Sequence, residues 1–308
     1  MDLKQLEYIV QIAKENNITH AADKLFITQS ALNQQLLRLE KELGTPLFYR
    51  SRTDWRPTAA GEVYLKNAHE ILRIKKETYK LINDISENKK GTISVGLTQE
   101  RGIKMFTSIY PDFHEEYPDI TVVPREANVK KQQELIARGE LDIGILTICD
   151  SDRPNLRYIS ICSEDILLAV PMIHNYAQYA SKPMSVLDLK FFKNDSFILM
   201  HKESTLRPVI DDLFASAGIT PKILFETASN FAIITMIKSG MCCGILPFYH
   251  LKNYFDEIAC FHLYNYPSWN VVACYRAGNY LSRAEKYFIE LATDYWRKEI
   301  PKAATKVI

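Results

Sequence analysis

A short segment near the N-terminus concentrates side chains that could contact the bases of double-stranded DNA. Amides and hydroxyls can donate to or accept from base edges in the major groove, and an arginine follows on the same side. These residues are Gln29, Ser30, Asn33, Gln34 and Arg38. The alternative is an ordinary amphipathic helix whose polar face is only solvated. The neighbouring elements favour DNA recognition.

A helix is needed to present these side chains together. Leucines recur at spacings of four, three and four residues, which predicts one buried helical face. They are Leu32, Leu36, Leu39 and Leu43. Thr28 can cap the start of this helix, and Gly44 can end it, with Pro46 just beyond. Upstream, the pattern predicts a first helix that ends near Asn16 and a second helix capped by Thr19.

A basic segment follows the predicted recognition helix. After the apolar pair at residues 47–48, three arginines stand within seven residues, namely Arg50, Arg52 and Arg56. Guanidinium groups suit phosphate oxygens, so this segment is interpreted as a wing that lies along the DNA backbone. Two alternatives remain open. The segment could be a solvated loop, and Arg50 could turn inward to pair with an acidic side chain.

The run from Leu6 to Gly61 resembles the winged helix-turn-helix of LysR-type transcriptional regulators. The matching residues, in order and at the family's spacing, are Ala21, Ala22, Leu25, Gln29, Ala31, Leu32, Gln35, Leu39, Glu40, Leu43, Gly44, Pro46, Leu47, Phe48, Arg50, Thr58, Ala60 and Gly61. We include Thr28 and Thr58 among the expected DNA-binding residues. The departures are Ser30, Asn33, Gln34, Leu37 and Pro57. Because several of these face the groove, the operator sequence does not follow from the resemblance.

Composition fits a globular regulator of two domains. The chain has 308 residues, of which 47% are hydrophobic and 24% charged. No apolar run approaches the ~18 residues needed to span a membrane, and the first residues are acidic where a signal peptide would be basic. We therefore expect a cytoplasmic protein with no membrane partner. The net charge of +1 means that DNA affinity must come from local clustering and from two copies acting together.

Residues 58–90 are compatible with one long helix. Its apolar stripe consists of Tyr64, Ala68, Ile71, Leu72, Tyr79, Ile82 and Ile85. A stripe of this length needs a partner, which is either the chain's own domain or a second subunit. The resemblance implies a linker helix that pairs two subunits. We therefore expect a homodimer or homotetramer, and RNA polymerase is a candidate partner of a regulator that acts at promoters.

From Thr92 onward, strand and helix patterns alternate, which predicts an α/β fold. The segments 134–145 and 239–247 again resemble the family, and they imply a two-lobed effector domain like type 2 periplasmic binding proteins. The predicted fold class is thus α/β and multidomain. The expected divisions are a winged helix-turn-helix at 1–58, a linker helix at 59–90 and an effector domain at 91–308. Within the last, lobe I comprises 91–161 and 268–308, and lobe II comprises 162–267.

An effector should bind where the carboxyl ends of the strands face the crevice between the lobes. The expected lining residues are Thr98, Gln99, Val129, Thr147, Ser204, Thr205, Asn230 and Phe231. Hydroxyls, amides and helix-start N–H groups suit a small carboxylate or a similar acceptor-rich ligand. Val129 stands where the family commonly has serine or threonine, so this side of the pocket should be more apolar.

Enzyme motifs are absent from the sequence. There is no GxSxG, HExxH, GxxxxGKS/T or GxGxxG, and the SxxK spacing at residues 86–89 lies in a charged helix end. The cysteines show no CxxC spacing and the histidines are scattered, so we expect no metal and no cofactor. A redox role for Cys242 and Cys243 is the alternative to a core role. A solute-binding protein is the alternative to a regulator, but the N-terminal module favours a DNA-binding regulator controlled by a small effector.

Overall fold

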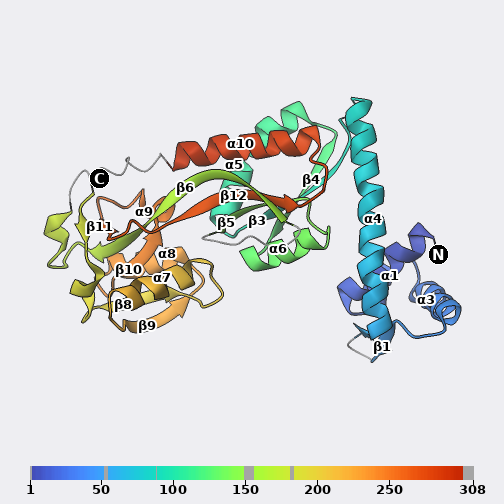
Figure 1. The fold of residues 1–308 in the computed structure, drawn as a ribbon, viewed down its shortest axis with the longest axis horizontal. Coiled ribbons are helices and arrows are strands. Elements are labelled where there is room, and N and C mark those ends of the chain that lie inside the picture. The colour runs from blue at the N-terminus through green and yellow to red at the C-terminus, as the bar shows by residue number, and fades with distance from the viewer. Residues whose placement is uncertain (1, 52–54, 88, 149–155, 181–183, 301–308) are drawn as a thin grey trace.

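The computed structural model describes residues 2–51, 55–87, 89–148, 156–180 and 184–300. Arg52 of the predicted wing and Cys149 lie outside the described residues. Figure 1 shows a helical N-terminal domain at one end, a single long helix beside it, and an elongated α/β domain on the other side of that helix. Within the described residues, no helix is both long and apolar enough to cross a membrane.

The N-terminal domain consists of three helices and a two-stranded antiparallel wing. These elements are α1 (Leu3–Glu15), α2 (Ile18–Lys24), α3 (Gln29–Leu43), β1 (Phe48–Arg50) and β2 (Trp55–Pro57). The predicted cap of α3 is confirmed, because Thr28 Oγ1 accepts from the N–H of Ala31 at 3.2 Å. The predicted cap of α2 is wrong. Asn17 caps this helix by accepting from the backbone of Thr19, which lies inside the first turn.

Three of the four predicted leucines form the buried face of α3, namely Leu32, Leu36 and Leu39. Leu43 is 44% exposed, because it is the last residue of the helix and lies beyond the helices packed against it. The wing is joined tightly to the following helix at Gly61. A Cβ atom at this position would lie 2.0 Å from the carbonyl oxygen of Leu47, so only glycine fits here.

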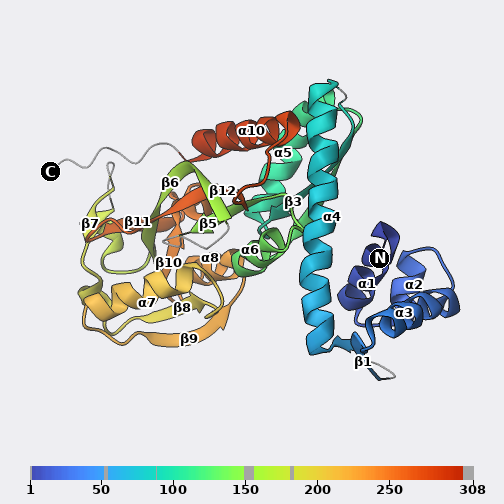
Figure 2. The same cartoon turned by 45° about the vertical axis from the view of Figure 1, so that its right-hand side comes forward.

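Helix α4 (Ala59–Ile85) has 27 residues and is about 40 Å long at 1.5 Å per residue. Both ribbon views place it between the N-terminal domain and the effector-binding part (Figures 1 and 2). The helix ends at Ile85 rather than at Lys90, and the first strand of the α/β domain begins at Gly91.

Lobe I is built on a mixed sheet with helices on both faces. Its elements are β3 (Gly91–Leu97), α5 (Arg101–Glu116), β4 (Ile120–Glu126), α6 (Val129–Ala137), β5 (Ile143–Ile148), β12 (Ser268–Arg276) and α10 (Arg283–Glu299). Strands β4, β3 and β5 are parallel, and β12 runs antiparallel to β5. Helices α5 and α10 pack together over one face, around Phe113, Phe288 and Trp296, while α6 covers the other face.

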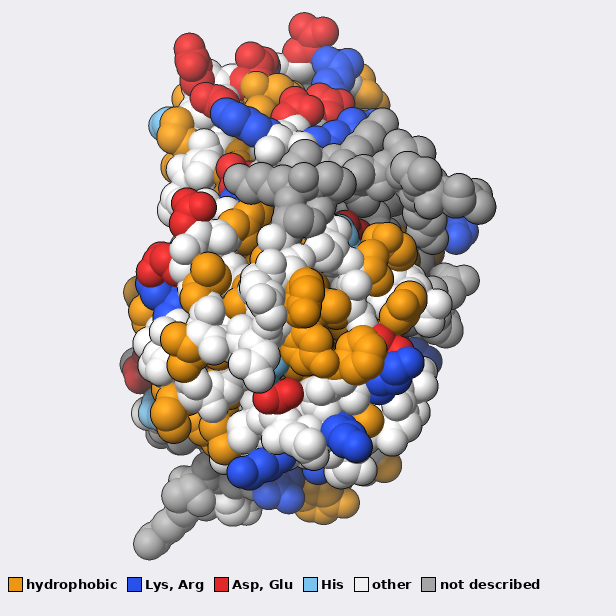
Figure 3. Space-filling model, turned by 90° about the vertical axis from the view of Figure 1, so that its left-hand side faces the viewer, with side chains coloured by type: hydrophobic (Ala, Val, Ile, Leu, Met, Phe, Trp, Pro, Cys, Tyr) orange, Lys and Arg blue, Asp and Glu red, His pale blue; other side chains and the backbone are white. Residues whose placement is uncertain are grey.

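Lobe II contains β7 (Val186–Leu187), β8 (Ser196–Met200), α7 (Leu206–Ser216), β9 (Lys222–Thr227), α8 (Asn230–Lys238), β10 (Gly244–Pro247), α9 (Phe248–Leu251) and β11 (Ile258–Leu263). Strands β8 and β9 are parallel and form a separate two-stranded sheet. The segment 239–247, which resembles the family, contains β10. Figure 3 views the molecule from this end and shows hydrophobic side chains gathered on the surface of lobe II.

The two lobes share one long strand, β6 (Leu156–Pro171). Its first part pairs with β12 of lobe I up to Asp165, and from Ile166 it pairs with β10 and β11 of lobe II. The exchange of partners therefore comes later than the predicted boundary at 161–162. At that predicted boundary the β6–β12 pairing has a register shift that leaves Ile161 as an extra residue, a β-bulge.

Candidate functional site

The start of α3 presents the polar face that the sequence predicted. Gln29, Ser30, Gln34 and Arg38 are exposed, and Asn33 is half-buried. The hydroxyls of Thr28 and Ser30 lie 3.1 Å apart. Figure 2 shows α3 on the side of the N-terminal domain that faces away from the effector-binding part. This arrangement leaves the amides accessible to a DNA groove.

The turn between α2 and α3 exposes a residue that the sequence analysis missed. Phe26 is 95% exposed and has a φ angle of 55°, in the left-handed region. An exposed aromatic ring in a left-handed conformation is unusual for a non-glycine residue. It lies two residues before Thr28, the cap of α3, so it adds apolar surface next to the exposed amides of this helix.

Glu40 joins the recognition helix to the wing. Its Oε1 atom accepts from the backbone N–H of Leu47 at 2.8 Å, and its Oε2 atom accepts from the guanidinium of Arg50. The Arg50 guanidinium also lies over the Trp55 ring, 5.7 Å from its centroid. This is the inward arrangement that the sequence left open for Arg50, and it makes a structural role the better assignment. Arg56 is exposed on the second strand of the wing.

Thr58 occupies a structural position rather than a DNA-facing one. Its hydroxyl accepts from the N–H of Gly61 at 3.0 Å and donates to the carbonyl of Pro46 at 2.7 Å. The residue is buried. We therefore correct its expected role, since a hydroxyl that caps α4 and holds the chain before the wing is not available to a phosphate.

A cavity of about 320 Å³ lies between the lobes. Seven of the eight predicted effector residues line it, namely Thr98, Gln99, Val129, Thr147, Ser204, Thr205 and Asn230. Phe231 does not line this cavity and is 65% exposed. The reason is helical geometry, because one step along α8 turns the side chain by about 100°. The predicted convergence of strand ends is therefore observed for the other seven residues.

Helix starts converge on the same cavity. Arg101, Val129, Leu206 and Asn230 are the first residues of α5, α6, α7 and α8, and all four line the space. Helix N-termini carry partial positive charge and exposed N–H groups. The lining also includes His201 and Glu203, which follow β8 directly and could have been found by the strand-end rule.

A buried ion pair closes one side of the cavity, and the sequence analysis missed it. Arg101 Nη1 donates to Glu164 Oε2 at 2.8 Å, and the same oxygen accepts from Trp269 Nε1 at 2.7 Å. The guanidinium lies over the ring of Trp296 at 4.5 Å from its centroid. Arg101, Glu164 and Trp269 come from α5, β6 and β12, so this cluster joins three elements where the chain passes between the lobes.

His250 beside this cluster is held neutral. Burial lowers its pKa to about 3, and the positive charge of Arg101 acts in the same direction.

One hydrogen bond joins the two lobes directly. Ser229 Oγ of lobe II donates to Glu100 Oε1 of lobe I at 3.3 Å. Glu100 and Ser229 are the sequence neighbours of Gln99 and Asn230, which line the cavity. A change in the distance between the lobes would therefore change this contact.

Helix α4 is attached to lobe I by a second group of charges, in which the carboxylates of Asp142 and Glu285 are buried. Lys80 donates to Asp142 at 2.7 Å and also to Glu285, while Lys76 donates to Asp142 at 2.6 Å. Burial alone would raise the pKa of Asp142, but the two ammonium groups outweigh it and hold this pKa at about 2. Ser94 completes the set by donating both its N–H and its hydroxyl to Asp142.

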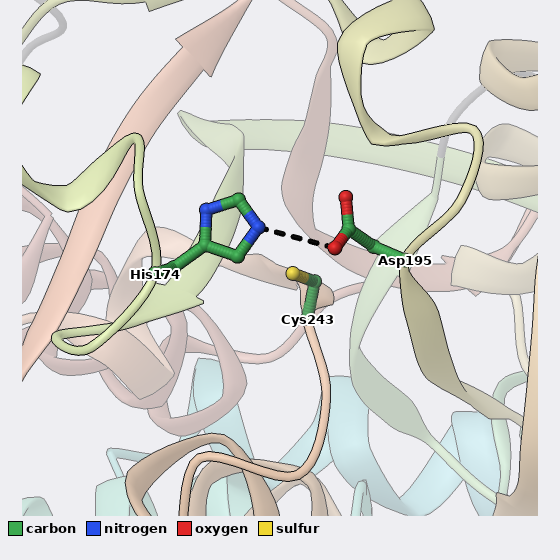
Figure 4. A group of neighbouring side chains, drawn as sticks. All are labelled: His174, Asp195 and Cys243. Carbon is green, nitrogen blue, oxygen red and sulfur yellow. Dashed lines mark hydrogen bonds and ion pairs between the residues drawn. The ribbon is translucent and has the colours of Figure 1, made fainter.

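Lobe II brings together three side chains that are distant in the sequence. His174, Asp195 and Cys243 have ligand atoms that all lie within 4.8 Å of one another, and Figure 4 shows the sulfur, the ring and the carboxylate turned towards one another. The sequence analysis expected no metal site, because its test relied on close spacing along the chain.

Comparison with known proteins agrees with the two-part architecture. The family model described as the LysR substrate binding domain matches residues 86–297, and the model of the bacterial regulatory helix-turn-helix protein, lysR family, matches residues 3–62. A probable RuBisCO transcriptional regulator of Emiliania huxleyi is 30% identical over 244 residues, which cover 78% of this chain and 76% of that protein.

Solved structures show the same fold. A variant of full-length OxyR from Pseudomonas aeruginosa is similar with a TM-score of 0.74 at 22% identity, and the match covers 100% of this chain and 99% of that chain. CbnR in complex with its target DNA is similar with a TM-score of 0.59 at 21% identity, covering 97% and 100% of the two chains.

The matched families contain transcriptional regulators rather than enzymes, which agrees with the expectation that this chain has no catalytic activity. The two family models together cover α3, the wing and the residues that line the cavity between the lobes. The chain therefore belongs to the LysR family of transcriptional regulators, with an N-terminal helix-turn-helix DNA-binding domain and a C-terminal effector-binding domain.

Proposed function

We propose that this regulator reads its operator with the start of α3 and responds to a small anionic or acceptor-rich effector between the lobes. The observation that carries the effector proposal is the shared cavity of about 320 Å³, which seven predicted residues line. This volume lies at the lower end of the usual range for small-molecule sites. Four helix N-termini at one cavity favour a carboxylate, because each contributes partial positive charge and N–H donors.

The operator contacts are proposed for the exposed residues of α3 and the wing. Gln29, Ser30, Asn33 and Gln34 would face base edges, while Arg38, Arg52 and Arg56 would hold phosphates. Arg50 is proposed to support the wing through Glu40 instead. The solved structure of CbnR with its target DNA supports DNA contact by this fold.

We further propose that the protein acts as a homodimer or homotetramer. Apolar side chains are exposed along α4, namely Val63, Ile74, Tyr79, Leu81, Ile82 and Ile85. The contacts of α4 with its own lobe I are made by charged side chains. The exposed apolar side chains are therefore available for pairing with a second copy of the chain. A promoter-bound regulator of this kind would act in the cytoplasm, with RNA polymerase as a candidate partner.

The test uses the full-length chain. Operator affinity would be measured by fluorescence anisotropy, and metabolites would be screened by thermal shift, since a ligand specific for the folded state raises its stability. Thr98→Val and Thr147→Val should abolish the response to a hit while leaving operator binding intact. Thr121→Val is the matched control, because Thr121 is an exposed residue of lobe I that does not line the cavity.

Two outcomes would contradict the proposal. Wild-type sensitivity in both cavity variants would mean that the effector does not bind between the lobes. If no promoter fragment binds with higher affinity than random DNA, operator recognition is contradicted. The two results are independent, so one part of the proposal can fail without the other.

A further inference from the structure

The cluster formed by His174, Asp195 and Cys243 has the composition of a transition-metal site. His174 Nε2 lies 3.1 Å from Asp195 Oδ1, and the three ligand atoms lie within 4.8 Å of one another. Imidazole, carboxylate and thiolate together are ligands of Zn²⁺ and similar divalent ions. We propose that these three side chains form a binding site for a divalent transition-metal ion of the Zn²⁺ type in lobe II, separate from the effector cleft.

The backbone holds two of the ligands side by side. Asp195 directly precedes β8, and Cys243 directly precedes β10. The N–H of Cys243 donates to the carbonyl of Ser196 at 2.8 Å, and Phe197 and Cys243 form a parallel bridge. Because these contacts fix the two chain segments, Asp195 and Cys243 do not depend on flexible loops for their approach.

The third ligand is fixed by its turn and by ring packing. His174 follows β6, and its N–H donates to the carbonyl of Pro171 at 3.0 Å. Its ring stacks on Phe192, with the ring centroids 5.4 Å apart. The ligand atoms need to move by only about an ångström to reach the 2.0–2.3 Å bonds of a tetrahedral zinc site.

Hydrogen bonds define the protons that an ion would displace. The Nδ1 atom of His174 accepts from the N–H of Tyr176 at 3.2 Å, so the ring proton lies on Nε2 and is donated to Asp195. The Cys243 thiol is buried and would lose its proton on binding, because the thiolate is the form of cysteine that binds metal ions.

The net charge of the three side chains favours binding of a divalent ion. Binding through Nε2 would release the thiol proton to solvent and move the ring proton to Nδ1, so the Tyr176 N–H that now donates to Nδ1 would have to turn away from it. The cluster would change from one negative charge, on Asp195, to neutral with a divalent ion, a thiolate and a carboxylate. Neutrality suits a site in which the sulfur is buried and the His174 and Asp195 side chains are only partly exposed. The partly exposed side leaves room for a water as the fourth ligand.

The site lies at the opposite end of β8 from the effector cleft. Asp195 precedes the first residue of the strand, whereas Met200 at its last residue lines the inter-lobe cavity. The strand has five residues, so the two sites are about 15 Å apart at 3.3 Å per residue. A bound ion would connect the segments before β8, before β10 and after β6. It would therefore stabilise lobe II without touching the effector.

The experiment uses full-length protein that is stripped with a chelator and then titrated with Co²⁺ and with Zn²⁺. Cobalt reports on the ligand directly, because a thiolate bound to Co²⁺ gives a charge-transfer band in the near ultraviolet. We expect one Co²⁺ per chain with this band, and a rise in the thermal unfolding temperature with Zn²⁺. Cys243→Ser should lose the band, whereas Cys242→Ser should keep it as the matched control, because Cys242 is an adjacent buried thiol.

Two further variants keep the proposal falsifiable if Cys243→Ser does not fold. His174→Gln and Asp195→Asn change partly exposed side chains, and each should weaken Co²⁺ binding by about ten-fold or more. The absence of a thiolate band in the wild-type protein would overturn the proposal. Loss of the band in Cys242→Ser, or unchanged Co²⁺ affinity in both His174→Gln and Asp195→Asn, would also overturn it.

Discussion

The ammonium group of Lys80 donates a 2.7 Å hydrogen bond to the carboxylate of Asp142. This contact joins α4, which follows the DNA-binding domain, to the lobe that forms half of the cleft between the lobes. Glu285 accepts from the same ammonium group, so one lysine connects α4 with the start of β5 and with α10. A change in lobe I therefore has a direct route to α4.

Removal of this lysine should be costly. Lys80→Met would leave the buried carboxylates of Asp142 and Glu285 without their shared cation, with only Lys76 remaining on Asp142. We expect a loss of about 3 kcal/mol in the free energy of unfolding, measured by urea denaturation. The control is Lys89→Met, which removes an exposed pair with Glu116 and should leave the free energy of unfolding nearly unchanged. Equal losses in the two variants would refute a special role for the buried contact.

The amides of α3 should distinguish operator from random DNA. Gln34→Ala is expected to weaken operator binding by ~1–3 kcal/mol and random binding much less, because only the operator offers the matching base edge. Gln35→Ala is the control, because it removes the same kind of side chain from the next position of the helix. Any loss of affinity in this variant should be equal for operator and random DNA. Anisotropy titrations would measure both, and equal losses for Gln34→Ala would assign it to a non-specific contact.

The wing arginines should separate into two roles. Arg56→Ala is expected to lower the slope of log affinity against log salt by about 0.9, as for one lost phosphate contact. Arg56→Lys keeps the charge and should restore most of the slope. Arg50→Ala should instead reduce thermal stability, since it removes the cation from Glu40 and the contact with Trp55. A full unit of slope lost in Arg50→Ala would show that this arginine binds phosphate after all.

Stability should fall in mild acid because of His250. Its pKa of about 3 in the folded chain lies below the ordinary value of 6.5. As the pH drops below 6.5, the unfolded chain takes up a proton that the folded chain excludes, so folding loses about 1.4 kcal/mol per pH unit from this group. Urea denaturation between pH 6 and 4.5 should show a shallower pH dependence in His250→Asn. Parallel curves for variant and wild type would contradict the assignment.

Local signals explain why the recognition helix could be predicted from sequence. Thr28 and Gly44 act through contacts within a few residues, and the period of the leucines directly reflects the buried face. The choice between Asn17 and Thr19 as the cap of α2 was not decidable in this way, because both residue types cap helices well. Leu43 was misplaced because periodicity does not show where the covering helices end.

The cleft was largely predictable for a different reason. Carboxyl ends of neighbouring parallel strands meet at one edge of a sheet, so Thr98 and Thr147 had to lie close together. The ion pairs beside the cleft and between α4 and lobe I were not predictable. Arg101 and Glu164 are 63 residues apart and Lys80 and Asp142 are 62 apart, and nothing local in the sequence identifies one residue from the other.

The continuous course of β6 determines how the lobes can move. Because the same strand is hydrogen-bonded to β12 in one lobe and to β10 and β11 in the other, closing the cleft has to twist a ribbon of backbone. The bulge at Ile161 adds local twist to β6 within lobe I, four residues before Asp165, where the strand changes partners. A rotation of one lobe relative to the other would therefore be resisted by the backbone hydrogen bonds of a continuous strand. A ligand shifts the balance between an open and a closed arrangement of the lobes only as far as its unequal affinity for the two arrangements allows.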